Sequence, residues 1–367
     1  MDKKKILIVT YGFFPDLSPR SLRSAELVKE FCRQGHVVKV IAPYRQGVES
    51  LQKEFSFTFK DLGKVTWKVP QLPINNKLTY LLNRALTRGL KLLLEYPRIQ
   101  LLWKTKHALK NEAGFDLLIS IAIPYPIHWG VASVLEKNKM AKLWVADCGD
   151  PYIGAENDNL KKPFYFKYIE KWFCRKVDYL TVPTPTSYLG YYKEFHSKIK
   201  VIPQGFRFED IKIAEYKPNK RPTFAYAGQL MKKRRDPGEL CEYLLQKGQD
   251  FEFHLYTKAV DLVESYAKKS DGRIIIHDFL PRRKLLFELS KMDFMVNFEN
   301  KGVSQTPSKI IDYTIINKPI LSIKPGSLDP QIVDEFLIGN YSNAYRIEDP
   351  NIYRIENVTK QFLSLVS

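Results

Sequence analysis

The sequence predicts an α/β fold made of two consecutive domains, each built on a parallel sheet. Short apolar runs of strand length alternate with segments whose apolar residues repeat at helical spacing. This alternation stops at a polar, proline-bearing stretch at 212–222 and then starts again. A chain of 367 residues is too long for one ordinary core, and it fits two domains of about 150 to 200 residues each.

The first half opens with a strand, a helix and a second strand. Residues 4–10 are a short apolar run, residues 21–36 repeat apolar side chains at near-helical spacing up to Gly35, and residues 37–43 are again apolar. This order implies a parallel, buried sheet. Further strands are predicted at 115–122, 142–148, 177–184 and 198–205, with a helix at about 126–138.

The second half repeats the alternation and ends in a helix. Strands are predicted at 223–230, 251–256, 273–277, 292–298 and 318–323, separated by helices at about 236–247, 259–269, 281–291 and 307–316. The pattern gives domains at 1–204 and 205–350 and a closing helix at 351–367. Ligands of such Rossmann-like sheets bind beyond the C-terminal strand edges, which here are expected to face each other across a central cleft.

The composition predicts a cytoplasmic protein with an anionic partner. The 58 Lys and Arg residues exceed the 40 acids and give a net charge of +18, which suits nucleic acid, a membrane face or phosphorylated ligands. No nucleic-acid motif accompanies the charge, so we expect no nucleic-acid partner. The four cysteines are scattered without zinc spacing, and neither a secretory leader nor a spanning apolar stretch is visible.

A basic, leucine-rich segment at 77–111 has two interpretations. Lys77, Arg84, Arg88, Lys91 and Arg98 form one stripe if the helix is continuous to Pro97, and leucines line another face. Such a helix can lie on an anionic membrane. It can equally pack on its own sheet with solvated cations outside.

The stretch 306–321, TPSKIIDYTIINKPIL, predicts an anion site at a helix start. Thr306 suits the N-cap and Pro307 the first helical position, so free amide groups and the helix dipole would favour a phosphate there. Lys309 and Asp312 share one helical face, and the carboxylate could accept the hydroxyls of a ribose. The alternative is a capped surface helix with a salt bridge between the two.

Two further clusters follow strands. YAGQLMKKRRDPGEL at 226–240 places four consecutive cations after a strand that ends at Gly228, where arginine could clamp a diphosphate or simply be solvated. WVADCGDPY at 144–152 delivers Asp147 and Asp150 to a strand end, as catalytic or sugar-binding carboxylates or as turn formers. His128 is a third catalytic candidate, although a lone histidine near a helix start is more often a local cap.

Four motifs in this order resemble the GT-B glycosyltransferases of family 4. TPSKIIDYTIINKPIL is similar to their signature of Pro-Ser-Lys, an acid and Tyr before Gly-Lys-Pro-Ile-Leu, and AGQLMKKRRDP is similar to their phosphate-clamping loop. WVADCGDPY resembles the strand end of members that act on cell-surface polysaccharides, and KILIVTYGFFPDLSPRSLRSAELVKEF resembles their N-terminal loop and helix. The likeness covers nearly the whole chain.

The resemblance implies two facing Rossmann-like domains, an acceptor domain at 1–204 and a nucleotide-sugar domain at 205–350, with the final helix crossing back. It implies retaining transfer of a sugar from a nucleotide diphosphate to a glycan or polyprenyl-linked glycan, at the inner face of the plasma membrane. No cofactor and no metal are expected, so cations must neutralise the leaving diphosphate.

Residue roles implied by the resemblance follow its motifs. Donor nucleotide and diphosphate contacts are expected from Gly12, Gly228, Arg234, Arg235, Ser308, Lys309 and Asp312. Donor sugar contacts are expected from Glu299 and Ser304, and the loop that borders the acceptor carries Arg20 and Arg23. Three positions depart from the family pattern: Ser304 replaces the first of two paired glutamates, Gln229 replaces an arginine of the clamp, and Gly149 replaces an arginine at the strand end. A different class of function, a catalytically silent scaffold that binds anionic lipid or a partner, stays open.

Overall fold

The computed structural model describes residues 2–134, 139–149, 151–154, 161–278, 280–299 and 308–366. Two compact units divide the chain. Unit 1 comprises Met1–Phe206 together with Ile355–Ser367, and unit 2 comprises Arg207–Arg354. The α/β class with one parallel sheet in each half is confirmed.

Unit 1 is built on a parallel sheet whose seven described strands have the order β3-β2-β1-β4-β5-β6-β7. The strands are β1 (Lys5–Thr10), β2 (Val37–Ala42), β3 (Thr58–Asp61), β4 (Phe115–Ile121), β5 (Ala141–Asp147), β6 (Tyr179–Val182) and β7 (Ile199–Val201). Apolar clusters cover both faces, as the continuous apolar runs predict. The edge strand β3 was not predicted, because its sequence TFKD contains no apolar run.

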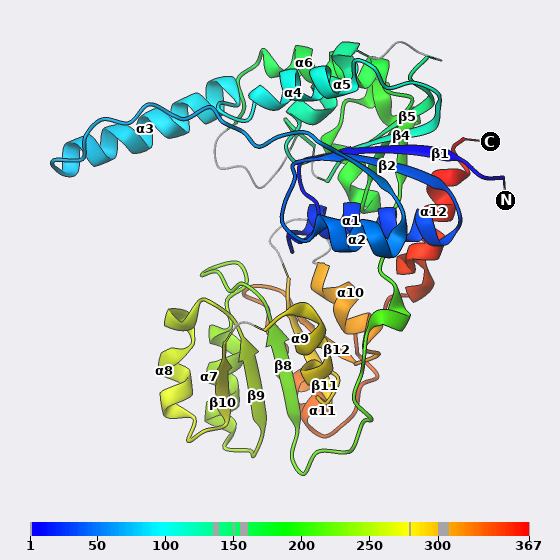
Figure 1. The fold of residues 1–367 in the computed structure, drawn as a ribbon. Helices are drawn as coiled ribbons and strands as arrows, with labels where there is room; N and C mark the ends of the chain where they lie inside the picture. Colours follow the sequence, from blue (N-terminus) through cyan, green and yellow to red (C-terminus); the bar gives the residue numbers. More distant parts are fainter. Residues whose placement is uncertain are drawn as a thin grey trace. The chain divides into compact units, whose positions relative to one another are not determined.

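Helices lie on both faces of this sheet (Figure 1). They are α1 (Pro19–Arg33), α2 (Val48–Phe55), α3 (Lys77–Leu94), α4 (Gln100–Leu109), α5 (Pro126–Val134), α6 (Phe166–Lys176) and α12 (Ile355–Leu363), with 3-10 turns at Pro185–Gly190 and Lys193–Lys198. The C-terminal α12 returns to unit 1, where Val358 and Phe362 join the cluster that contains α1. Gln34 Nε2 also donates to Thr359 Oγ1 at 2.7 Å. The predicted returning helix is therefore confirmed.

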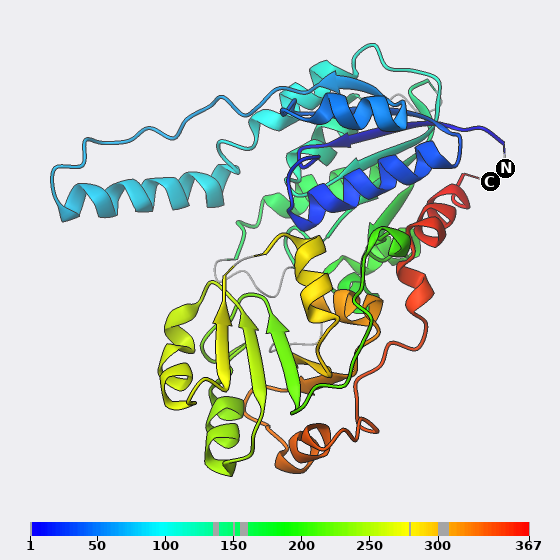
Figure 2. The same cartoon turned by 60° about the horizontal axis from the view of Figure 1, so that its bottom comes forward.

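Helix α3 differs from the other helices of unit 1 because it extends away from the sheet. Figures 1 and 2 show it projecting as an arm, with the chain segment that precedes it running alongside. Within the described residues, Asn83 is the one buried residue of α3. No helix in the described part of the chain combines the length and apolarity required to cross a bilayer.

Unit 2 is built on a parallel sheet whose five described strands have the order β10-β9-β8-β11-β12. The strands are β8 (Thr223–Ala227), β9 (Glu252–Tyr256), β10 (Ile274–His277), β11 (Phe294–Phe298) and β12 (Ile320–Ile323). The helices are α7 (Gly238–Lys247), α8 (Glu264–Lys269), α9 (Arg282–Leu289), α10 (Ser308–Ile315) and α11 (Pro330–Leu337), with 3-10 turns at Phe208–Asp210, Val260–Leu262 and Pro350–Tyr353. Phe224 stacks on Phe253 and Phe294 at centroid distances of 4.8 and 4.5 Å and holds the middle of the sheet.

Strand order decides where a ligand of either sheet would bind. In unit 2 the chain leaves β8 toward β9 on one side and later returns to pair β11 on the other side of β8. Successive connections therefore diverge beyond the C-terminal ends of β8 and β11, which is where open parallel sheets bind ligands. In unit 1 the same divergence occurs between β1 and β4.

Candidate functional site

Lys309 lies against the turn that follows β8, at this edge of the unit 2 sheet. Its Nζ donates to Tyr226 Oη at 2.6 Å and lies 4.1 Å from the centroid of the Tyr226 ring. Gly228 has a positive φ of 144°, and a Cβ placed on it would lie 2.0 Å from Lys309 Nζ. The turn therefore requires glycine, both for its backbone and for the space that the lysine fills.

A second cation lies close to Lys309. Burial lowers the pKa of Lys309 to about 7, and the nearby positive charge of Arg235 contributes to the shift. Two cations brought together in a partly buried place repel each other, and a bound anion would relieve the repulsion. The site at Gly228 thus has the charge that a phosphate group requires, and α10 begins beside it at Ser308.

Arg234 and Arg235, two members of the four-cation run 232–235, have different surroundings. The backbone of the loop is closed on itself, since Met231 N donates to Arg235 O and Arg234 N donates to Met231 O, both at 3.1 Å. Arg235 lies near Lys309, whereas Arg234 lines a cavity of about 590 Å³ that is bordered by α7, α8 and the C-terminal ends of β11 and β12. Of the two arginines predicted for the diphosphate, Arg235 is the one that the structure brings to Lys309.

Asp312 is paired with an arginine that sequence reasoning missed. Its Oδ1 accepts from Arg282 Nε at 3.1 Å and also from Nη2. Burial raises the pKa of the Asp312 carboxyl, and Arg282 opposes that rise. The predicted salt bridge from Lys309 to Asp312 is replaced by this pair. The one sequence signal for Arg282 is the short basic run 282–284 at the start of α9.

Glu299 follows β11 at the same sheet edge as Gly228. Its backbone N–H donates to Ile323 O at 2.9 Å, and its Oε1 accepts from Ser322 Oγ at 2.9 Å. These bonds hold Glu299 against β12 at the C-terminal end of β11. Ser304, the other predicted sugar contact, lies outside the described residues, as do Thr306 and Pro307.

Replacing Gly228 by alanine is expected to displace Lys309 and weaken anion binding at this site at least about tenfold, since one charged hydrogen bond contributes roughly 1.5 to 3 kcal/mol. The added Cβ would meet Nζ and Cε at 2.0 Å, and the positive φ would be strained. Titration with a nucleoside diphosphate measures the loss. Gly272→Ala is the control, because Gly272 also has a positive φ but no atom within 4 Å of its Cβ position. Equal affinities in the two variants would contradict the role of Gly228.

In unit 1, Asp147 ends β5 inside an ion-pair network. Arg23 Nη2 donates to Asp147 Oδ1 at 2.8 Å and Arg23 Nε donates to Oδ2 at 3.1 Å. Arg20 Nη1 and Thr181 Oγ1 donate to the same carboxylate at 3.2 and 2.7 Å. Burial acts to raise the pKa of Asp147, but the two arginines outweigh it and hold the pKa below its ordinary value.

This network changes the interpretation of Asp147 and Arg23. Both side chains are 2% exposed, so neither has the access that a catalytic or acceptor contact requires. Arg23 also donates to the backbone oxygens of Ile202 and Pro203, the two residues after β7, and so links α1 to that segment. The predicted catalytic role of Asp147 and acceptor role of Arg23 are therefore corrected to structural ones.

His128 is likewise a core residue rather than a catalytic candidate. It is fully buried, its Nδ1 shares a hydrogen bond with Ser120 Oγ at 2.8 Å, and its ring stacks on Phe173. Burial lowers the pKa of His128 to about 3, which keeps the imidazole neutral. The histidine joins α5 to β4 through Ser120 and does not act as a local cap of its helix.

Arg20 is partly exposed at the unit 1 edge and lies against the buried Gly149. The Arg20 side chain is 20% exposed, and it lies on α1 rather than in the preceding loop. A Cβ on Gly149 would lie 2.1 Å from Arg20 Nη2, so the guanidinium of Arg20 fills the space beside this glycine. Asp150 lies outside the described residues.

Gly12 has a packing role in the structure. A Cβ on Gly12 would lie 2.8 Å from Ser21 Oγ, and Ser24 Oγ donates to Gly12 O at 2.6 Å. The glycine therefore lets the loop after β1 approach α1. Among the described residues, no three His, Cys, Asp or Glu side chains group as metal ligands would.

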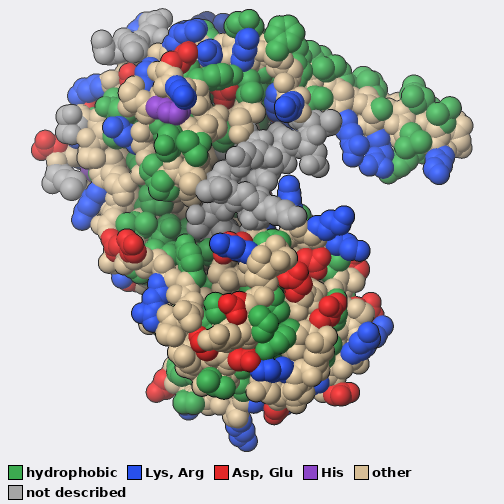
Figure 3. Space-filling model, turned by 180° about the vertical axis from the view of Figure 1, so that it is seen from behind, with side chains coloured by type: hydrophobic (Ala, Val, Ile, Leu, Met, Phe, Trp, Pro, Cys, Tyr) green, Lys and Arg blue, Asp and Glu red, His purple; other side chains and the backbone are tan. Residues whose placement is uncertain are grey.

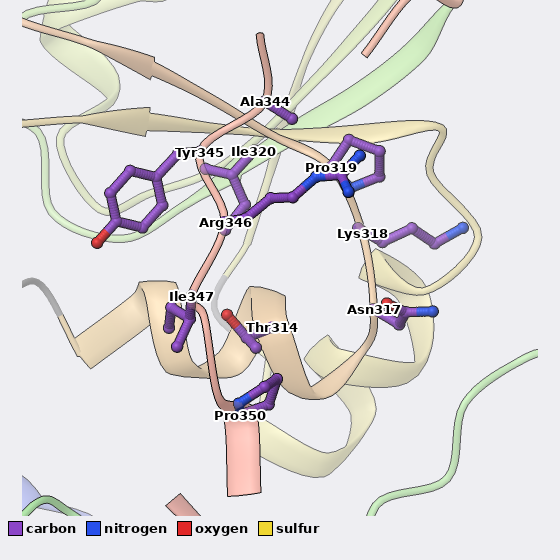
Figure 4. A pocket seen from close by; sticks show the side chains of 10 residues that line it. All are labelled: Thr314, Asn317, Lys318, Pro319, Ile320, Ala344, Tyr345, Arg346, Ile347 and Pro350. Atoms are coloured by element: carbon purple, nitrogen blue, oxygen red, sulfur yellow. The ribbon is translucent and has the colours of Figure 1, made fainter. Parts of the chain in front are cut away.

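A separate cavity of about 300 Å³ lies in unit 2 at the start of β12, the edge opposite to Lys309. Figure 4 shows Arg346 extending from the 344–350 segment toward Pro319 across this cavity. Because it lies at the N-terminal strand edge, it is away from the place where the sheet would bind its ligand.

Solved structures with this fold cover the whole chain. A glycosyltransferase from Rickettsia africae ESF-5 has a TM-score of 0.61 at 12% identity and covers 100% of this chain and 98% of its own. Anabaena HepE in complex with UDP-glucose has a TM-score of 0.60 at 11% identity, with 99% of both chains covered. TarM has a TM-score of 0.63 at 12% identity, again with 99% of both chains covered. No family model matches the chain, and no curated protein matches its sequence. The chain has the GT-B fold.

Proposed function

We propose that this protein is a retaining glycosyltransferase that moves a sugar from a nucleotide diphosphate to a glycan or polyprenyl-linked glycan in cell-surface polysaccharide synthesis. The observation that carries the proposal is Lys309, held with Arg235 beside Gly228 at the ligand-binding edge of a GT-B fold. HepE, a protein with the same fold, has been solved with UDP-glucose. Its donor class supports a nucleotide sugar as the ligand here.

The donor is proposed to bind to unit 2. Lys309 and Arg235 contact the diphosphate, and Asp312, oriented by Arg282, accepts hydrogen bonds from the ribose hydroxyls. Glu299 contacts the transferred sugar from the end of β11. The leaving diphosphate gains negative charge as the glycosidic bond breaks, and preorganised cations stabilise that charge without a metal or cofactor.

The transfer itself uses the donor phosphate as the base. The bond between the sugar C1 and the diphosphate oxygen breaks while the acceptor hydroxyl oxygen bonds to C1 on the same face. The hydroxyl proton passes to the departing phosphate, so that the products are the glycosylated acceptor and the nucleoside diphosphate. This route needs no side-chain base, which agrees with the burial of His128 and Asp147. Arg20, whose side chain is partly exposed at the unit 1 edge, is left to border the acceptor.

A catalytically silent scaffold is the second candidate. The observations that favour it are the three departures from the family pattern, at Ser304, Gln229 and Gly149. Such a scaffold would keep the fold and its basic surface but would not bind a nucleotide sugar. In both cases the proposed location is cytoplasmic and peripheral to the membrane.

Calorimetry with UDP, GDP, ADP, CMP and their common sugar conjugates, without added metal, separates the candidates. We expect saturable, base-selective binding that Asp312→Ala weakens by roughly 1 to 3 kcal/mol, because the ribose loses an acceptor and Arg282 loses the carboxylate that it contacts. Glu348→Ala, at an exposed acid of the same unit, is the control. Absence of binding to every nucleotide and nucleotide sugar tested would reject the transferase and favour the catalytically silent scaffold. Unchanged affinity in Asp312→Ala would reject the site.

A further inference from the structure

Helix α3 exposes a wide apolar face. Six of its leucines are 39 to 63% exposed: Leu78, Leu81, Leu82, Leu86, Leu93 and Leu94. At 100° per residue, these side chains except Leu94 fall within one continuous face of the helix. The interpretation that this helix packs on its own sheet is therefore wrong, since the sheet covers none of these leucines.

Polar contacts hold the α3 arm, which we define as α3 with the preceding segment 64–76. Leu72 N donates to Asn83 Oδ1 and Asn83 Nδ2 donates to Leu72 O, both at 2.8 Å, which fastens the segment to the middle of the helix. Asn76 and Thr79 form a capping box at the helix start. The helix is thus kept in place while its leucines stay uncovered.

The other end of α3 is fastened to the segment that follows β5. Glu95 is 5% exposed and adopts a left-handed conformation as the C-cap. Its Oε2 accepts from Tyr152 Oη at 2.7 Å and from Lys162 Nζ at 2.8 Å. A buried carboxylate with two such donors makes a firm joint between the arm and unit 1.

The charge of the arm is one-sided. Residues 77–94 contain no acid, and the side chains of Lys77, Arg84, Arg88 and Lys91 form a stripe beside the apolar face. All four cations are exposed. Figure 3 shows hydrophobic and Lys or Arg side chains along the arm, at the right of that view. An apolar face with a cationic border matches the acyl and headgroup layers of an anionic bilayer.

Aromatic residues gather where the arm joins unit 1. Trp67 stacks on Tyr96 at a centroid distance of 5.7 Å and lies 5.5 Å from Trp103. The two tryptophans are 41 and 52% exposed. Trp and Tyr are enriched at the boundary between lipid and water, where an apolar ring and a polar edge are both satisfied.

We propose that the α3 arm docks in the surface of an anionic bilayer, with its leucines in the acyl layer and its cations at the headgroups. A second copy of the chain is the less suitable occupant, because two such helices would bring eight cations together without an acid to pair them. The arm lies in unit 1 and shares no residue with the donor site in unit 2. The docking therefore does not depend on the proposed sugar transfer.

The test is co-sedimentation of the full chain with vesicles of equimolar phosphatidylglycerol and phosphatidylcholine, compared with phosphatidylcholine alone. We expect binding to the first only. The triple variant Arg84→Glu, Arg88→Glu, Lys91→Glu should lose about a hundredfold or more in affinity, since each cation near the surface contributes about fivefold. Leu81→Gln, Leu82→Gln, Leu86→Gln should also lose about a hundredfold. The control Lys212→Glu, Lys217→Glu, Lys220→Glu makes the same charge change at exposed residues of unit 2.

Other results would overturn the proposal. Vesicle binding that survives both α3 variants would reject the arm as the docking surface. Absence of vesicle binding by the wild-type protein would also reject membrane docking. If light scattering then showed a dimer for the wild type and a monomer for the leucine variant, a second copy of the chain would be what covers the apolar face. The α3 variants should bind nucleotide as the wild type does in calorimetry, and Asp312→Ala should bind vesicles as the wild type does. These two measurements distinguish a failure of membrane docking from a failure of the proposed sugar transfer.

Discussion

Lys309→Met is expected to lower the affinity for a nucleotide sugar by about tenfold to a hundredfold, the equivalent of one charged hydrogen bond of roughly 1.5 to 3 kcal/mol. Methionine keeps most of the length of the side chain that fills the space at Gly228 but removes the positive charge. Calorimetric titration gives the change. Lys318→Met is the matched control, because Lys318 is a second partly buried lysine over a tyrosine ring, at the opposite sheet edge.

The same lysine predicts how binding depends on pH. Burial holds the pKa of Lys309 at about 7 in the free protein, so below that pH the lysine is already charged and the affinity is constant. A bound diphosphate raises that pKa, and above pH 7 binding must therefore take up a proton. The affinity then falls by up to about tenfold per pH unit until the pKa of the complex is reached.

Proton uptake can be measured directly. Calorimetry in two buffers of different ionisation enthalpy should report close to one proton taken up per nucleotide sugar at a pH above 8, and none in Lys309→Met. A nucleotide sugar is used because its diphosphate does not titrate in this range. Equal pH profiles for the wild type and Lys309→Met would show that the diphosphate does not meet Lys309.

Asp147→Ala is expected to destabilise unit 1 by about 3 to 5 kcal/mol, because it leaves the buried guanidinium of Arg23 without its counter-ion. Chemical denaturation with a probe of unit 1 measures the change. Asp147→Ala combined with Arg23→Met should be less destabilised than the sum of the two single variants, since neither charge of the pair is then left buried without the other. If the double variant is as unstable as the sum of the single variants, the pair is not the cause.

Asp147 also gives stability a defined pH dependence. Its folded pKa is held below the ordinary value of 3.8 by Arg23 and Arg20 against the effect of burial. The contribution of the carboxylate is therefore fully present above pH 4 and is lost as pH falls through the folded pKa. The double variant should lack this acid-sensitive part of the stability.

The sheets could be predicted because buried parallel strands are continuous apolar runs, as at Lys5–Thr10 and Phe294–Phe298. The edge strand β3 carries no such run, because its residues are half-exposed. The position of Lys309 at this sheet edge followed from its place at the start of a helix that comes after a strand. Local order along the chain therefore predicted that Lys309 lies at this edge of the sheet.

Pairing between distant residues could not be predicted in the same way. Asp312 and Arg282 are 30 residues apart, and Asp147 and Arg23 are 124 residues apart. An acid at a strand end looks the same in sequence whether it faces a ligand or a buried arginine, and only the packing of α1 decides between them. His128 was misplaced for the same reason, since its partner Ser120 lies on a different element.

The hydrogen bonds of Glu95 fix the α3 arm relative to the end of β5, and this determines how unit 1 would lie on a membrane. Helix α3 has 18 residues and is therefore about 27 Å long, comparable to the width of a small domain. Its fixed end is bonded to Tyr152, which lies five residues after the end of β5. A docked arm would therefore fix the height and the tilt of the β5 edge above the lipid headgroups. The distance from the β5 edge to an acceptor held in the membrane would then be set by the docked arm.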